Sequence, residues 1–101
     1  MLKGLENVLR GTMKTSGNYH YECNSKDLGT TEIFYHTTCI CAYDDDLGIG
    51  FADNRGFNTQ STNRAVNDCK RWLESNGYTL VDVKDFKERT GAECRVGGWA
   101  Y

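Results

Sequence analysis

The sequence predicts a single α+β domain, spanning residues 1–101, in which a small sheet packs on one main helix. Three observations support this. Apolar residues recur at the helical period over residues 62–76, runs rich in β-branched and aromatic residues flank that stretch, and 101 residues suit one domain. We expect three to five short, mostly antiparallel strands and a weaker N-terminal helix.

The stretch from residue 62 to residue 76 carries the clearest signal. One helical stripe holds its apolar side chains, Ala65, Val66, Cys69, Trp72 and Leu73. Ser61 or Thr62 is the expected N-cap, and Gly77 is the expected left-handed stop. Because only one stripe is apolar, this helix needs a partner layer.

Residues 31–43 predict the strongest strand, since they are dense in β-branched and aromatic types. An uninterrupted strand would place Cys39 and Cys41 on the same face. A turn at 44–46 and a second strand at 47–52 complete a hairpin, in which Gly50 lies on a face of small residues suited to close packing against the helix or another backbone.

Further segments receive weaker predictions. Residues 19–23 indicate an edge strand and 78–83 another strand; 84–91 is a helical turn or a loop, and 96–101 packs back or forms a last strand. The expected core comprises Ile33, Ile40, Ile49, Phe51, Ala65, Val66, Cys69, Trp72, Leu73, Leu80 and Val83.

The charge balance restricts the classes of partner. Twelve basic and fourteen acidic residues are too even for a nucleic-acid clamp or for a protein that imitates DNA. No segment approaches the ~20 apolar residues of a membrane helix, and the first residues lack the apolar centre of a secretion signal. We therefore expect a cytoplasmic protein that does not engage a membrane.

Five cysteines and two histidines raise the question of disulfides, metal and catalysis. The odd cysteine count without an export signal favours free thiols. A zinc set would draw on His20, Cys23, His36, Cys39 and Cys41, but no Cys-x-x-Cys pair is present. In a single strand His36 also faces away from both nearby cysteines. We expect no metal, no cofactor and no catalytic residue, with a zinc protein or a cysteine-dependent small enzyme as the more distant alternative.

Polar turns and the exposed helix face supply the expected contact surface. The aspartates at 44–46 form a turn that can meet a basic partner, and 53–55 is a second turn. The expected partner-binding residues are Asp44, Asp45, Asp46, Asp53, Asn54, Arg55, Arg64 and Arg71.

One stretch resembles a known class of protein. His36-Thr37-Thr38-x-Ile40, then Gly56-Phe57-x-Thr59, then Ser61-Thr62-x-Arg64-x-x-Asn67 is similar to a pattern in small accessory proteins of bacteriophages and prophages. The resemblance covers residues 36–67. It implies a compact sheet-plus-helix fold and supplies no catalytic residues.

Small phage proteins of this length often act by binding, as anti-CRISPR proteins do. The resemblance therefore implies a non-enzymatic interaction protein that inhibits a host defence complex of the CRISPR-Cas kind by binding its protein surface. The expected partner is a host protein or ribonucleoprotein in the host cytosol. A small nucleic-acid-binding module is the alternative, and a homodimer stays open.

Overall fold

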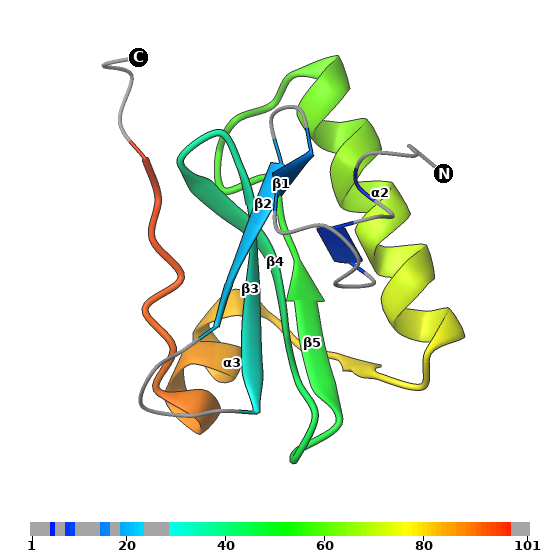
Figure 1. Cartoon of the computed structure of the whole chain (residues 1–101), viewed down its shortest axis with the longest axis vertical. Helices are drawn as coiled ribbons and strands as arrows, with labels where there is room; N and C mark the ends of the chain where they lie inside the picture. The colour runs from blue at the N-terminus through cyan, green and yellow to red at the C-terminus, as the bar shows by residue number, and fades with distance from the viewer. Residues whose placement is uncertain (1–4, 6–7, 10–14, 17–18, 24–28, 98–101) are drawn as a thin grey trace.

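The computed structural model describes residues 5, 8, 9, 15, 16, 19–23 and 29–97 (Figure 1). Within these residues, six strands form one sheet in chain order: β1 (Thr15–Ser16), β2 (Tyr19–Cys23), β3 (Thr30–Tyr35), β4 (Thr38–Asp44), β5 (Ile49–Ala52) and β6 (Thr79–Leu80). Neighbouring strands are antiparallel except β5 and β6, which are parallel because helix α2 (Gln60–Ser75) connects them.

The α+β prediction is thus confirmed, and so is the mostly antiparallel sheet: the sheet is mixed, with four antiparallel strand pairs and one parallel pair. One difference is that two strands of only two residues bring the described strands to six, above the expected three to five. One of these, β1, pairs with β2, so β2 is not the edge strand that the sequence suggested.

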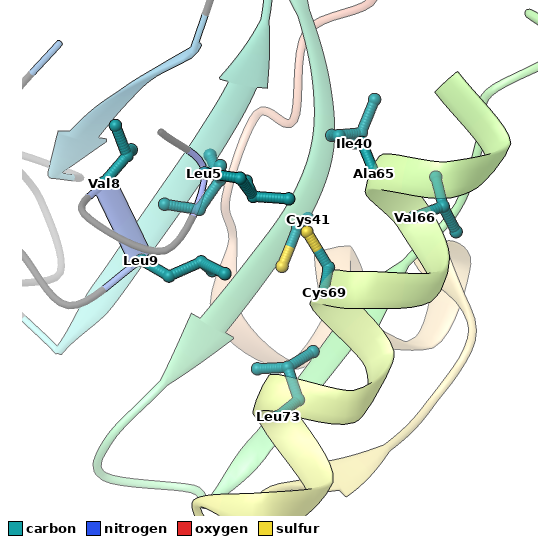
Figure 2. Packing of buried hydrophobic residues seen from close by; sticks show 10 residues of the cluster. Leu5, Val8, Leu9, Ile40, Cys41, Ala65, Val66, Cys69 and Leu73 are labelled. Atoms are coloured by element: carbon teal, nitrogen blue, oxygen red, sulfur yellow. The ribbon is translucent and has the colours of Figure 1, made fainter. Parts of the chain in front are cut away.

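Two apolar clusters lie on the two faces of the sheet. Helix α2 covers one face and α3 (Val83–Thr90) the other. The α2-face cluster contains Leu5, Val8, Leu9, Ile33, Ile40, Cys41, Ala65, Val66, Cys69 and Leu73 (Figure 2). The α3-face cluster contains Phe34, Cys39, Ala42, Ile49, Phe51, Phe86, Ala92 and Cys94. Each helix thus has its own buried partner surface.

The predicted strand over 31–43 is wrong, because the chain reverses at its middle. Tyr35 pairs with Thr38 across a two-residue loop, so β3 and β4 form a hairpin. His36 has a φ of 57° at the first loop position, where such turns normally place glycine. No glycine, proline, asparagine or aspartate marks the turn in the sequence.

A β-bulge then changes the facing of β4. Ile33 pairs with Cys41 and Phe34 pairs with Cys39, so Ile40 is the additional residue on β4. Ile40 and Cys41 both point to the α2 face, whereas Cys39 points to the α3 face. The expectation that Cys39 and Cys41 share a face is therefore wrong.

Helix α2 begins and ends through local signals. The hydroxyl of Thr59, not Ser61 or Thr62, caps the helix by accepting the Thr62 amide at 3.2 Å. Gly77 has a φ of 85°, which confirms the left-handed stop. Gly50 lets α2 approach the sheet, since an added Cβ there would lie 3.0 Å from Leu73 Cδ2. Close packing at this glycine is thus confirmed.

The segment after α2 departs from the predicted strand over 78–83. Asp82 caps α3 by accepting the Asp85 amide at 2.8 Å, so the chain turns helical at Val83 after only two strand residues. Two predicted core residues differ accordingly: Leu80 is 38% exposed and Val83 is half-buried against the α3-face cluster. Trp72 is also only half-buried, at the margin of the α2-face cluster.

The two chain ends are described in part. Leu5, Val8 and Leu9 have helical backbone and are buried, while the rest of the expected N-terminal helix lies outside the described residues. Toward the other end, the amide of Cys39 donates to Arg95 O at 2.8 Å, so the segment after α3 runs along the start of β4. Residues 98–101 of the expected packed tail also lie outside the description.

Neither α2 nor α3 nor any other helix among the described residues has the length and apolar character needed to cross a membrane.

Candidate functional site

The predicted contact residues lie at three separate places. Asp45 and Asp46 are exposed in the β4–β5 turn. Asp53 and Arg55 line a groove of about 520 Å³ against α3. Arg64 and Arg71 line another groove, of about 540 Å³, along α2.

Asp44 is buried rather than projecting. Its Oδ2 accepts the hydroxyl of Thr30 at 2.7 Å and its Oδ1 accepts the amide of Leu47 at 2.9 Å. A buried carboxylate with such partners organises the turn. The structure thus places Asp44 beneath the expected contact surface, with Asp45 and Asp46 on it.

Asn54 and Arg55 also have internal partners. The Asn54 amide donates to Asn63 Oδ1 at 3.0 Å, which ties the turn to the first part of α2. Arg55 Nη1 donates to the carbonyl oxygens of Cys39 and Cys94, each at 3.0 Å. Both side chains therefore hold loop geometry, whereas Arg64 and Arg71 are exposed on α2.

Three aromatic side chains gather beside the β4–β5 turn. The rings of Trp72 and Tyr78 stack at 6.0 Å between centroids, and Tyr43 packs against both, at 5.3 and 5.1 Å. All three are half-buried, so part of each side chain is exposed to solvent. Sequence reasoning assigned Trp72 to the core and missed this cluster, because Tyr43 and Tyr78 are brought together only by the sheet.

The Tyr78 hydroxyl joins the aromatic cluster to the acidic turn by donating a hydrogen bond to Asp45 Oδ1. Burial, and then Asp45 itself, raises the pKa of Tyr78 well above that of a free tyrosine, so the phenol stays a donor at neutral pH. Leu47 and Leu80 are exposed nearby, at 52% and 38%. We call this surface the acidic–aromatic end: Asp45, Asp46, Leu47, Trp72, Tyr78 and Leu80.

The β4–β5 turn, β6 and the C-terminal end of α2 all lie toward the lower side of Figure 1. A backbone bond from the Thr79 amide to Gly48 O, at 2.8 Å, holds β6 against the turn. The acidic–aromatic end is therefore built on connected regular elements rather than on a free loop.

A small cavity gathers residues of the phage-like pattern. It has a volume of about 210 Å³ and is lined by Tyr35, His36, Thr38, Ile40, Phe57, Thr59, Ser61 and Thr62. Small-molecule sites usually occupy about 300–1,000 Å³. This cavity suits a guest no larger than one side chain.

Of the zinc set considered from sequence, the three residues whose side chains are described do not come together. His36 is exposed in the β3–β4 turn, while Cys39 and Cys41 are buried on opposite faces of the sheet. The side chains of His20 and Cys23 lie outside the description. Burial is the largest cause that raises the pKa of both the Cys39 and Cys41 thiols, which opposes the thiolate that nucleophilic catalysis needs.

Comparisons of the chain with protein families, with curated proteins and with solved structures found no match.

Proposed function

We propose that this chain is a non-enzymatic interaction protein that binds a macromolecular partner through the acidic–aromatic end. The observation that carries this is the meeting of half-buried Trp72 and Tyr78 with the Asp45 carboxylate, beside which Asp46 is exposed in the same turn. Tryptophan and tyrosine dominate the energetic centres of protein interfaces, and carboxylates at the rim select a basic partner.

The chemistry of this surface fits a protein whose own surface is basic. A nucleic-acid-binding face of a host defence complex, such as a CRISPR-Cas ribonucleoprotein, has that character. We therefore propose a phage-type inhibitor that acts in the host cytoplasm by covering such a face. The phage and anti-CRISPR part of this proposal rests on the resemblance of residues 36–67.

The test is affinity capture from a bacterial host that carries an active CRISPR-Cas system, with matched variants as bait. Asp45→Lys/Asp46→Lys reverses the charge at the rim of this surface, and Trp72→Ala removes the aromatic ring at its centre. Glu88→Lys, an exposed charge change on α3, is the control. We expect wild type and control to retain the same specific partner, and Trp72→Ala to weaken it by about 30-fold, since central residues contribute about 2 kcal/mol or more.

A functional readout accompanies the capture. Expression of wild-type chain should raise phage plaquing on the immune host, and the rim-reversed variant should not. Equal capture by wild type and both variants would remove the acidic–aromatic end from the proposal, and unchanged immunity would remove the inhibitor role.

Nucleic-acid binding is the competing outcome, through the exposed Arg64 and Arg71 of α2. The Arg71 guanidinium lies 3.8 Å from the Asp68 carboxylate, which offsets part of that charge. A gel-shift titration at two salt concentrations separates the cases, because a phosphate-driven complex weakens steeply with salt. The molar mass in solution, measured by light scattering, decides between monomer and homodimer.

A further inference from the structure

Three buried residues from distant parts of the chain bring potential metal-ligand atoms together on the α3 face. Glu32 comes from β3, Cys39 from β4 and Cys94 from the segment after α3. One carboxylate oxygen and the two Sγ atoms all lie within 4.8 Å of one another. Sequence separations of 55 and 62 residues from Cys94 hide this group from any local motif.

A network of hydrogen bonds holds together the three residues that carry these potential metal-ligand atoms. Arg55 Nη1 donates to the carbonyls of both Cys39 and Cys94 at 3.0 Å, which holds the two cysteine backbones together. The amide of Cys94 donates to Glu32 Oε1 at 2.8 Å and orients that carboxylate. A hydrogen bond that orients a carboxylate, as the Cys94 amide does here, is typical of metal sites.

The backbone at the cluster is also unusual. Cys94 has a φ of 47° and Arg55 a φ of 55°, the left-handed region that favours glycine. Non-glycine residues hold such conformations where the surroundings over-determine them, and these positions concentrate at functional sites. Here both residues belong to the same hydrogen-bonded network.

The charges of the group match a divalent cation. With both thiols deprotonated, Glu32, Cys39 and Cys94 carry three negative charges, and the adjacent Arg55 carries one positive charge. A dication makes the buried set neutral, which matters because unpaired buried charge is strongly unfavourable. Two thiolates with one carboxylate favour zinc among divalent ions.

We propose that Glu32, Cys39 and Cys94 bind one Zn²⁺ ion. Tetrahedral Zn–S bonds of about 2.3 Å separate two sulfur atoms by about 3.8 Å, so the sulfurs need to approach by no more than about 1 Å. The two thiol protons pass to solvent and no electrons are transferred. Among the described residues no fourth side chain joins the group, and a water molecule completes the coordination. The ion ties β3 and β4 to the C-terminal segment, independently of the proposed partner surface.

The other buried cysteine pair provides a matched control. Cys41 and Cys69 point their sulfur atoms toward one another on the α2 face (Figure 2). Their neighbours in that cluster are aliphatic, and no carboxylate accompanies them in the described part of the chain. These two thiols pack as small apolar side chains.

The test is metal binding by the full chain, purified in reductant and stripped with a chelator. Zn²⁺ affinity is measured by competition with a chromophoric chelator, and Co²⁺ serves as a spectroscopic probe of thiolate ligands. We expect one Zn²⁺ per chain, a higher melting temperature with zinc, and sulfur-to-cobalt charge-transfer bands. Cys94→Ser should weaken binding by more than the roughly 10- to 100-fold lost when a ligand's hydrogen-bond partner is removed.

Variants separate coordination from folding. Cys69→Ser should keep the cobalt bands, whereas Cys39→Ser and Glu32→Gln should lose or shift them with unchanged circular dichroism. Glu32→Gln keeps an oxygen acceptor for the Cys94 amide, so its loss of affinity would report the carboxylate itself. A reduced wild-type chain that binds no zinc, or one that binds equally after Cys94→Ser, overturns the proposal.

Discussion

The α2 face and the α3 face of this sheet bury cysteine pairs in very different surroundings. On the α2 face, Cys41 and Cys69 lie among leucine, isoleucine and valine. On the α3 face, Cys39 and Cys94 lie beside Glu32 and Arg55. The same strand supplies one cysteine to each pair, since the bulge at Ile40 turns Cys39 and Cys41 to opposite sides. A single additional residue thus places one thiol among aliphatic side chains and the other beside a buried carboxylate.

The largest effects should come from truncating one fully buried side chain of each helix. Phe86 and Leu73 are both fully buried, and Phe86 meets Phe51 edge to face at 5.2 Å between centroids. We expect Phe86→Ala to cost about 3–5 kcal/mol and Leu73→Ala about 2–5 kcal/mol in the free energy of unfolding, measured in urea. A cost below about 1 kcal/mol for Phe86→Ala would mean that α3 is not a true second layer.

The next largest effect concerns Arg55, whose guanidinium braces the α3 face. Arg55→Met leaves two carbonyl oxygens without their charged donor, and should cost about 1.5–3 kcal/mol in urea unfolding. Arg95→Met is the control, since Arg95 lies over the Phe34 ring at 5.1 Å on an exposed surface. Its loss should cost about 0.5–1 kcal/mol. Equal costs for the two substitutions would contradict the bracing role of Arg55.

The helix caps offer a smaller and paired comparison. Thr59→Ala should destabilise α2, and Asp82→Ala should destabilise α3, each by about 1 kcal/mol. Ser61→Ala, at the position that the sequence suggested, should stay within about 0.5 kcal/mol. Thermal or urea unfolding checks all three, and a larger loss from Ser61→Ala than from Thr59→Ala would reverse the cap assignment.

The smallest effect concerns pH. The pKa of Tyr78 is raised in the folded chain, so above the unfolded value of about 10 the unfolded state loses its proton first. The stability that the Tyr78 phenol adds to the folded state is fully present below that pH and declines as the pH rises further. Stability measured at pH 8 and pH 10.5 should therefore fall more in wild type than in Tyr78→Phe. An identical fall in both would show that the phenol titrates normally.

Local signals explain why α2 could be predicted. Its apolar stripe is recognised from the helical period alone, and its end is recognised from the ability of Gly77 to adopt a positive φ. The Thr59 cap was misplaced by two or three residues, as helix ends often are, because several hydroxyl residues compete for the role. The hairpin of 30–44 escaped prediction because His36 adopts the positive φ without a glycine.

Long-range pairing explains what the sequence concealed. The burial of Asp44 depends on Thr30, and the exposure of Trp72 depends on where Tyr43 and Tyr78 meet it. The bulge at Ile40 has no sequence signature, yet it decides which thiols become neighbours. Of the predicted contact residues, Asp45, Asp46, Asp53, Arg64 and Arg71 are exposed, while Asp44, Asn54 and Arg55 are committed to internal bonds.

The sorting of the cysteines to opposite faces is the central claim, and nuclear Overhauser effects between side-chain protons test it most directly. The fold predicts cross-peaks from the Cys39 β protons to Cys94 and Glu32, and from Cys41 to Cys69. Cross-peaks from Cys39 to Cys69, or from both Cys39 and Cys41 to the same helix, would contradict it.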